Sequence, residues 1–258
     1  MGREHVAAYR ECGVKIVDVR PDIVSIASPD DTHAEYVIEA LQSGAHVFCE
    51  KPLATNRADM MEIMGLADEK CIWQNFPLRY QPLFVDLKEK IKDFGEIYRI
   101  EASYNWGRTH KLYESWRNRN PDYSLVMGGM IHMVDLVVWL TGMEIEPSMV
   151  AGVNLSAPGF PGPDTVSALC KLDNGGICNF TVDGGTGVDK HNHRITIHGT
   201  KGGITVVNHE PTDKQACIFD FVEMLEKKEN HNSGIYSTVV ALMIDEGRRQ
   251  MQEEAKWV

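Results

Sequence analysis

The chain has 258 residues and carries 26 Lys and Arg against 37 Asp and Glu, which gives a formal net charge of −11. Hydrophobic residues make up 43% and charged residues 24%, a composition that excludes a disordered or collagen-like chain. An acidic chain without a basic cluster is a poor partner for nucleic acid or an anionic membrane. No apolar run approaches the roughly 20 residues that cross a bilayer, and the N-terminal residues lack a secretory signal. We therefore expect a cytoplasmic protein of one large or two modest domains.

The six cysteines contain no C-x-x-C pair, which argues against a zinc ribbon or a thioredoxin-like site. We expect them to be reduced thiols that pack as small hydrophobic side chains. His191 and His193 are separated by one residue, but on a strand this spacing supplies only two ligands. No metal site is predicted.

The first part of the chain alternates between strand and helix patterns. Residues 22–27 form a short β-rich run that suits a strand buried on both faces, and residues 33–43 have apolar positions at helical spacing. A second strand is predicted over 45–49, and it is followed by a helix that Thr55 or Asn56 can cap. This alternation predicts βαβ units and a parallel sheet.

From residue 72 the pattern changes. Helices are predicted over 82–92, 129–140, 214–228 and 237–254, and alternating strands over 96–104, 149–155, 166–172, 177–182, 194–198 and 203–207. Asn174 and Gly175 mark a hairpin, in which a two-residue turn would make Cys170 and Cys178 near-neighbours. The sequence therefore predicts an α/β fold: an incomplete parallel sheet in residues 1–74, then an α+β domain in residues 75–258 with an open, mostly antiparallel sheet.

Two positions could carry chemistry. Lys51 follows a predicted strand, and ligands of open α/β sheets bind at the carboxyl ends of the strands. Its ammonium group could stabilise a developing alkoxide, although composition alone favours a surface Lys-Pro turn. His132 and Asp135 share one face of a predicted helix, where a histidine beside a carboxylate can move a proton. The commoner alternative is a core histidine that is hydrogen-bonded to backbone.

Several motifs occur in a specific order and spacing. They are Pro21–Pro29, Thr32–Glu35, Ala40–Leu41, Gly44–Val47 and Glu50–Ala54, with support from Arg79–Tyr80, Gly95–Ile97, Gly128–Gly142 and Gly199–Gly202. This pattern resembles the Gfo/Idh/MocA family of NAD(P)-dependent oxidoreductases, named after glucose–fructose oxidoreductase, inositol dehydrogenase and rhizopine catabolism proteins. The resemblance spans nearly the whole chain. It implies that residues 1–74 are an incomplete Rossmann-like domain for NAD or NADP.

The resemblance also implies roles for individual residues. Lys51 would lie at the nicotinamide and His132 would transfer the hydroxyl proton, while hydride moves between the cofactor and a sugar, polyol or related cyclic alcohol. The residues expected on the cofactor side are Ser28, Pro29, Thr32, His33, Glu50, Lys51 and Pro52. The residues expected to bind the small-molecule substrate are Arg79, Tyr80, His132 and Asp135. The exposed face of the open sheet predicts a homodimer or homotetramer.

The sequence departs from the family at two places. Many members carry Asp four residues before the catalytic histidine, where this chain has Gly128. The chain also contains no G-x-G-x-x-G turn, and residues 14–17, which resemble the second strand, lead almost directly to residues 22–27. Asp18 is the nearest candidate for a ribose contact, with a turn residue as the alternative. Two hypotheses follow: an oxidoreductase with a shortened cofactor domain or an incomplete chain, or a catalytically inactive relative that acts as a binding or assembly module.

Overall fold

The computed structural model describes residues 2–17, 20–67, 70–113, 116–120, 122–157, 159–185, 191–229 and 232–254. The chain forms two compact units, which are Met1–Gln81 with Thr212–Val239, and Pro82–Pro211 with Val240–Val258. Asp18 lies outside the described residues. The predicted α/β fold with a parallel sheet followed by a larger, mostly antiparallel sheet is confirmed.

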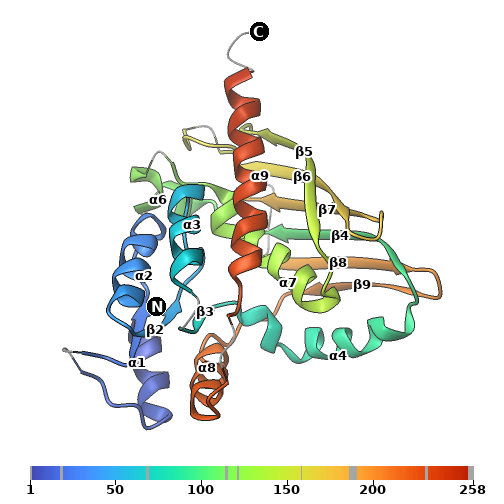
Figure 1. Ribbon diagram of the computed structural model, residues 1–258. Helices are drawn as coiled ribbons and strands as arrows, with labels where there is room; N and C mark the ends of the chain where they lie inside the picture. The colour runs from blue at the N-terminus through green and yellow to red at the C-terminus, as the bar shows by residue number, and fades with distance from the viewer. Residues whose placement is uncertain are drawn as a thin grey trace. The chain divides into compact units, whose positions relative to one another are not determined.

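The first unit contains a parallel sheet of three strands in the order β1-β2-β3 (Figure 1). The strands are β1 Ile23–Ile26, β2 His46–Cys49 and β3 Ile72–Gln74, with helices α2 His33–Gln42 and α3 Arg57–Leu66 in the connections. Asn56 caps α3 by accepting a hydrogen bond from the Asp59 amide at 3.0 Å. The sequence analysis did not predict β3, because three residues are too few to show a period.

Two expectations for this sheet are wrong. Residues 14–17, which resemble a strand of the family, form no strand. The predicted strand at 22–27 is present as β1, but it is at the edge of the described sheet, and Ser25 is exposed. A strand needs a hydrogen-bonding neighbour, and within the described residues β1 pairs with β2 alone.

Helices from both ends of the first unit complete its core. These helices are α1 Gly2–Glu11 and α8 Ala216–Glu226. Phe221 of α8 packs against Phe48 of β2 and Trp73 of β3, with ring centroids 5.7 and 6.0 Å apart. The apolar face of α8 therefore belongs to the first unit, whereas the division at residue 74 assigned this helix to the second domain.

The second unit is built on a six-stranded sheet in the order β5-β6-β7-β4-β8-β9 (Figure 1). Its strands are β4 Ile97–Asn105, β5 Ile145–Val153, β6 Thr165–Leu172, β7 Ile177–Asp183, β8 Asn192–Gly199 and β9 Gly203–Asn208. Strands β4 and β7 pair in parallel, and the other neighbouring pairs are antiparallel. Strand β5 begins four residues earlier than the strand predicted over 149–155, and it includes an irregularity between Pro147 and Met149.

Among the described residues, helices pack against one face of this sheet, and many side chains on the other face are exposed. The helices with residues in this unit are α4 Pro82–Lys90, α5 His110–Tyr113, α6 Trp116–Arg119, α7 Ile131–Thr141 and α9 Ile235–Glu254, which begins in the first unit. Helix α7 packs on β4, and Gly247 of α9 lies close to Val150 of β5. Short single turns occur at Asp30–Thr32, Pro77–Tyr80 and Ile91–Asp93. No helix among the described residues is long and apolar enough to cross a membrane.

The open face of the sheet is more mixed than the sequence analysis predicted. Large apolar side chains are exposed in its strands at Met149, Val153, Leu169, Ile177 and Val207. Hydroxyl pairs lie between them, such as Ser167 with Thr181 at 2.9 Å and Thr196 with Thr205 at 2.9 Å. The alternation of buried and exposed residues along the strands is confirmed, and the exposed half combines polar and apolar side chains.

The cysteines behave as expected. All six are described residues, and none forms a disulfide bond. The hairpin connection after β6 is longer than two residues, but Cys170 still lies opposite Cys178 in the register of β6 and β7. Burial raises the pKa of the Cys170 thiol to about 12, so this side chain remains a protonated, apolar group at neutral pH.

Candidate functional site

Lys51 lies in the turn that leaves β2, at the carboxyl end of the parallel sheet. Backbone hydrogen bonds fix this turn on both sides: the Glu50 amide donates to the Ile26 carbonyl, and the Asn75 amide donates to the Cys49 carbonyl, each at 2.9 Å. The turn is therefore tied to the ends of both neighbouring strands. The Lys51 side chain is half-buried.

The Glu50 carboxylate is the polar centre of this turn. It pairs with the His5 ring at 3.3 Å and accepts a hydrogen bond from the Asn75 side-chain amide at 3.0 Å. Burial alone would raise the pKa of Glu50, but the His5 hydrogen bond and the charges of His5, Lys51 and Lys214 outweigh burial and lower it. Glu50 therefore places a negative charge beside the Lys51 ammonium.

His33 links the ends of two strands from a fully buried position. Its Nδ1 is 2.6 Å from the Pro52 carbonyl oxygen, and its Nε2 is 2.9 Å from the Ser28 carbonyl oxygen. The Thr32 hydroxyl donates to the Ser28 hydroxyl at 2.7 Å and also approaches the Pro29 carbonyl at 2.8 Å. The structure thus brings together the residues expected on the cofactor side, and it holds His33 between them.

The carboxyl ends of β1, β2 and β3 lie along one edge of the parallel sheet. Ser28 follows β1, Lys51 follows β2 and Asn75 follows β3. The Asn75 Oδ1 atom is buried and accepts no hydrogen bond within the described part of the chain. A buried acceptor without a donor suits a ligand that carries an amide N–H group. Sequence reasoning missed Asn75, because it missed β3.

Arg79 and Tyr80, expected to bind substrate, are engaged inside the first unit. Arg79 donates to the Ser233 hydroxyl at 2.7 Å, and the Tyr80 hydroxyl donates to the Asp220 carboxylate at 2.6 Å. These contacts favour a structural contribution from both side chains. Their binding of substrate stays a prediction.

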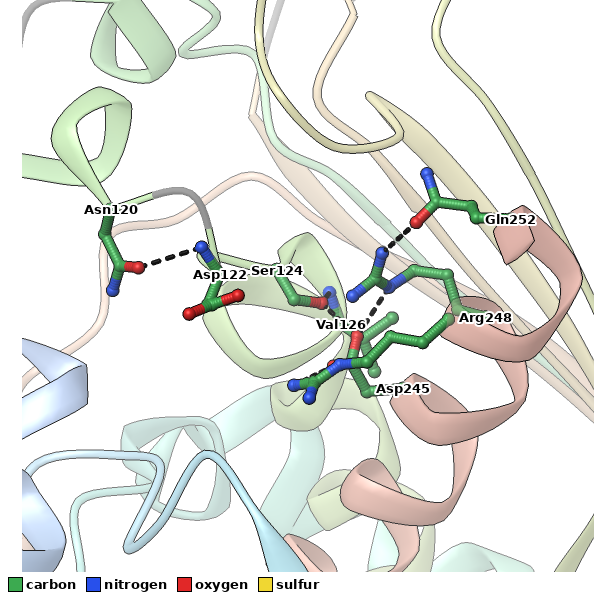
Figure 2. Close-up of polar contacts among 8 residues, drawn as sticks. Asn120, Asp122, Ser124, Val126, Asp245, Arg248 and Gln252 are labelled. Carbon is green, nitrogen blue, oxygen red and sulfur yellow. Dashed lines mark hydrogen bonds and ion pairs between the residues drawn. The ribbon is translucent and has the colours of Figure 1, made fainter. Parts of the chain in front are cut away.

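His132 belongs to the second unit and lies in the first turn of α7, which follows the π-helical turn η4 Val126–Met130. Ser124 anchors the start of this helical segment. Its hydroxyl donates to the Asp245 carboxylate of α9 and accepts a hydrogen bond from the Val126 amide at 3.0 Å (Figure 2). This anchor fixes the segment that presents His132.

Two arginines of α9 balance the buried Asp245 carboxylate. Arg248 Nε donates to it at 2.6 Å, and Arg249 Nε donates to its other oxygen at 3.0 Å. Arg248 also donates to the Gln252 side chain at 2.7 Å, as Figure 2 shows. Asp245 and Arg248 are both buried, so this ion pair is a rigid support for Ser124.

The structure explains the glycine at position 128. A Cβ atom added to Gly128 would lie 2.1 Å from the Tyr123 hydroxyl oxygen, so any side chain there would collide with the phenol. Arg117 Nε donates to the same hydroxyl at 3.2 Å. A phenol paired with a guanidinium therefore occupies the space that an aspartate would need.

Tyr104 joins the His132 ring to a cluster with His191 and His193. The Tyr104 ring of β4 contacts His132 edge-on at 6.0 Å between centroids, contacts His191 at 5.2 Å and stacks on His193 at 4.4 Å. The Tyr104 hydroxyl is 3.1 Å from His191 Nε2. Sequence reasoning considered His191 and His193 only as metal ligands, although their shared strand face was already a signal. Asp135 is buried in α7, and its binding of substrate stays a prediction.

Burial controls the protonation of this cluster. It lowers the pKa of His191 to about 4 and that of His193 to about 3, and the positive charge of Arg108 adds to both shifts. Burial also raises the pKa of Tyr104 to about 12. Near neutral pH the two imidazoles and the phenol are therefore uncharged.

Comparison with known proteins agrees with this architecture. Residues 3–73 match the family model described as oxidoreductase family, NAD-binding Rossmann fold, and residues 88–252 match the one described as oxidoreductase family, C-terminal alpha/beta domain. The chain belongs to the Gfo/Idh/MocA oxidoreductase family. The resemblance on which the residue assignments depend is thereby confirmed.

Relatives of this Gfo/Idh/MocA protein include several inositol dehydrogenases. It is 31% identical to myo-inositol 2-dehydrogenase of Thermotoga maritima over 80% of this chain and 62% of that protein. It is 28% identical to inositol 2-dehydrogenase 2 of Saccharopolyspora erythraea over 76% of this chain and 57% of that protein. The chain thus spans about 60% of the length of these curated relatives.

Solved structures share the fold at lower sequence identity. Scyllo-inositol dehydrogenase of Lactobacillus casei, solved with NAD(H) and scyllo-inositol, superimposes with a TM-score of 0.75 at 20% identity, and 97% of this chain covers 87% of that one. The WlbA dehydrogenase of Bordetella pertussis, solved with NADH and UDP-GlcNAcA, gives 0.78 at 22% identity, with 96% of this chain and 85% of that one covered.

Proposed function

We propose that this protein is an NAD(P)-dependent oxidoreductase that acts on a CH–OH group of a sugar, polyol or related cyclic alcohol. The observation that carries the proposal is the turn at Lys51, which strand-end hydrogen bonds hold at the carboxyl edge of a domain that matches an NAD-binding Rossmann fold. The relatives named as inositol dehydrogenases support the substrate class.

Lys51 and His132 have different roles in the proposed reaction. Lys51 donates a hydrogen bond to the reacting oxygen of the substrate and stabilises its developing negative charge. His132 takes the hydroxyl proton during oxidation and returns it during reduction. The nicotinamide, when bound, supplies the hydride acceptor or donor.

The first unit would hold the nicotinamide end of the cofactor. Ser28, Pro29 and Thr32 lie after β1, while Glu50 and Pro52 flank Lys51 after β2. His33 keeps these two segments together through its contacts to the Ser28 and Pro52 carbonyls. Asn75 adds a buried side-chain amide oxygen that accepts no hydrogen bond from the described residues.

A binding or assembly module without catalytic activity is the second candidate. It is favoured by the lack of a G-x-G-x-x-G turn in the sequence, because backbone amides of that turn provide much of the pyrophosphate recognition. Titration of the 258-residue chain with NADH and with NADPH, followed by fluorescence or calorimetry, separates the two candidates and compares the cofactors. Failure to saturate at millimolar concentration of either cofactor would favour the module.

If the cofactor binds, a panel of sugars and polyols tests the catalytic assignments. Lys51→Ala and His132→Ala should each lower kcat by about 100-fold or more, since positioned proton-transfer groups contribute that much, and cofactor affinity should be largely kept. Lys15→Ala and His110→Ala change the same residue types at exposed positions and serve as matched controls. Unchanged turnover in both test variants would refute the assignments.

The open face of the six-stranded sheet supports a homodimer or homotetramer, and we propose a cytoplasmic location for it. Apolar side chains such as Leu169 and Ile177 are exposed there between polar neighbours, a mixture that is common in subunit interfaces. Light scattering at micromolar concentration should give the mass of a dimer or tetramer, and Leu169→Glu should shift it toward the monomer. Met61→Glu, at an exposed position on α3, is the control. A wild-type monomer would contradict this arrangement.

A further inference from the structure

Arg108 lies in a segment that is fixed on both sides. The Trp106 amide donates to the Asp183 carbonyl at 2.7 Å, and the Thr109 hydroxyl contacts the carbonyls of Gly184 and Gly185 at 2.8 and 2.9 Å. These bonds tie the residues before and after Arg108 to the end of β7. The backbone position of Arg108 is therefore fixed, which limits the space that its half-buried side chain can reach.

The positive charge of Arg108 acts on the aromatic cluster of Tyr104, His191 and His193. It contributes to lowering the pKa of His191 and of His193, and it also acts on the Tyr104 hydroxyl. Arg117 acts on Tyr104 as well, and His209 acts on His191. The charged side chains that act on the cluster thus include two arginines, although the chain as a whole is strongly acidic.

The Arg108 carbonyl accepts a hydrogen bond from the Lys111 amide at 2.9 Å, whereas within the described residues its guanidinium group makes no hydrogen bond or ion pair with a protein group. Arg117, by contrast, is positioned over the Trp106 and Tyr123 rings, at 6.0 and 5.6 Å from their centroids, and donates to the Tyr123 hydroxyl. A guanidinium group is an effective partner for a planar anion, which it binds through two parallel hydrogen bonds. The donors of Arg108 thus remain available for a ligand.

The neighbouring rings supply further polar atoms. His193 is only 3% exposed, and its Nδ1 atom has no hydrogen-bond partner within the described residues. His191 and Tyr104 are hydrogen-bonded to each other at 3.1 Å. An orphaned buried nitrogen beside an unpaired guanidinium indicates a place where a polar ligand group is accommodated.

We propose that Arg108, together with His191, His193 and Tyr104, forms a subsite for a carboxylate group of the substrate, which is therefore an acidic sugar or polyol such as a uronate. This inference rests on the proposed function for its link to turnover, because the same cluster contacts His132. A carboxylate suits the site better than a phosphate dianion, because the one guanidinium that is free there among the described residues, that of Arg108, matches the geometry and charge of a planar monoanion.

Binding and turnover should be measured with D-glucuronate, D-glucose, myo-inositol and D-glucose 6-phosphate. D-Glucuronate should bind about tenfold or more tightly than D-glucose, since a charge-assisted hydrogen bond contributes at least that factor. Binding should also raise the pKa of His191, because a negative charge stabilises the imidazolium. Histidine NMR reports this change in the absence of cofactor and turnover.

Variants assign the preference to Arg108. Arg108→Gln should abolish the preference for D-glucuronate, Arg108→Lys should restore part of it, and NADH and NADPH affinities should stay unchanged. Arg194→Gln is the matched control, because Arg194 adjoins His193 on β8 but is exposed. Circular dichroism checks that each variant is folded.

Three results would overturn the inference: equal affinities for D-glucuronate and D-glucose, a stronger preference for D-glucose 6-phosphate, or loss of NADPH affinity in Arg108→Gln. The last result would assign Arg108 to a cofactor phosphate. A chain that binds D-glucuronate with the His191 shift but never oxidises a substrate would retain the subsite and refute the proposed function. Turnover of neutral polyols without binding of D-glucuronate would retain the proposed function and refute the subsite.

Discussion

His33 is a buried side chain that positions others through its ring. A carbonyl oxygen only accepts hydrogen bonds, and both ring nitrogens of His33 face carbonyls, of Ser28 and of Pro52. Replacement by Ala removes the link and leaves polar atoms and a void in a fully buried position. We expect His33→Ala to lower the free energy of unfolding by about 2–4 kcal/mol, measured by urea denaturation. The exposed control His110→Ala should cost less than 0.5 kcal/mol; equal costs would contradict this role.

Gly128 and Tyr123 form a pair whose coupling can be measured. Because a Cβ at position 128 would overlap the Tyr123 hydroxyl, Gly128→Ala should cost about 1–3 kcal/mol of stability. The cost should be much smaller when Tyr123 has already been changed to Ala. A double-mutant cycle by chemical denaturation gives this difference. Strictly additive costs would show that the two positions do not compete for space.

At the scale of single residues, sequence motifs were a better guide to the candidate site than hydrophobic periodicity was. Lys51 and His132 could be proposed as catalytic residues from the sequence, because each lies in a local pattern of fixed spacing. Arg108 and Tyr104 carry no such pattern. Tyr104 meets His193 only through the register of β4 with β8, and single-sequence patterns do not specify which distant strands pair.

At the scale of elements, the start of α7 depends on a residue more than a hundred positions away. Asp245 receives hydrogen bonds from Ser124, Arg248 and Arg249. Asp245→Asn removes the negative charge from this buried network and should cost about 3 kcal/mol or more, as loss of one partner of a buried ion pair does. Turnover should fall in parallel, because the segment that carries His132 loses its anchor.

Arg249→Gln tests the same network at its surface. The Arg249 side chain is 43% exposed, whereas that of Arg248 is 8% exposed. Exposed ion pairs contribute about 0–1 kcal/mol, so Arg249→Gln should be mild and Arg248→Gln severe. Thermal unfolding of the two variants checks this order. The reverse order would mean that burial does not decide the contribution of the pair.

Several elements with a clear period were predictable, and the shortest strand was not. Helix α2 and strands β6 and β9 agree with their predicted ranges to within one residue at each end, because each shows a clear period. Strand β3 is too short to show a period, and residues 14–17 have strand-like composition but pair with no strand within the described part of the chain. Whether each of these segments forms a strand therefore depends on pairing with a neighbouring strand rather than on its own composition.

At the scale of the whole molecule, acid should weaken the two units in different pH ranges. His191 and His193 have pKa values of about 4 and 3 in the folded chain, below the ordinary value of about 6.5. The unfolded chain therefore binds more protons, and the second unit loses stability as the pH falls from about 6.5 toward 4. Arg108 and His209 face these rings and add to the effect.

The first unit should lose most of its acid-sensitive stability at lower pH, although burial also lowers the pKa of His46 at the start of β2. The pKa of Glu50 is lowered in the folded state, so its stabilisation is complete above the unfolded value of about 4.3 and is lost as the pH falls through the folded value. Hydrogen exchange measured by mass spectrometry at pH 7, 5.5 and 4 resolves the units. Protection should decline first in β4 and β8, and earlier loss in β2 would contradict the assignment.

The discontinuity of the first unit has a consequence for biosynthesis. Its core needs Phe221 between Phe48 and Trp73, yet residues 82–211 of the other unit separate these residues in the chain. A ribosome therefore makes the whole six-stranded sheet before the helix that completes the first core. Until that helix emerges, the nascent chain exposes Phe48 and Trp73, which makes this interval the stage at which a chaperone would be most needed.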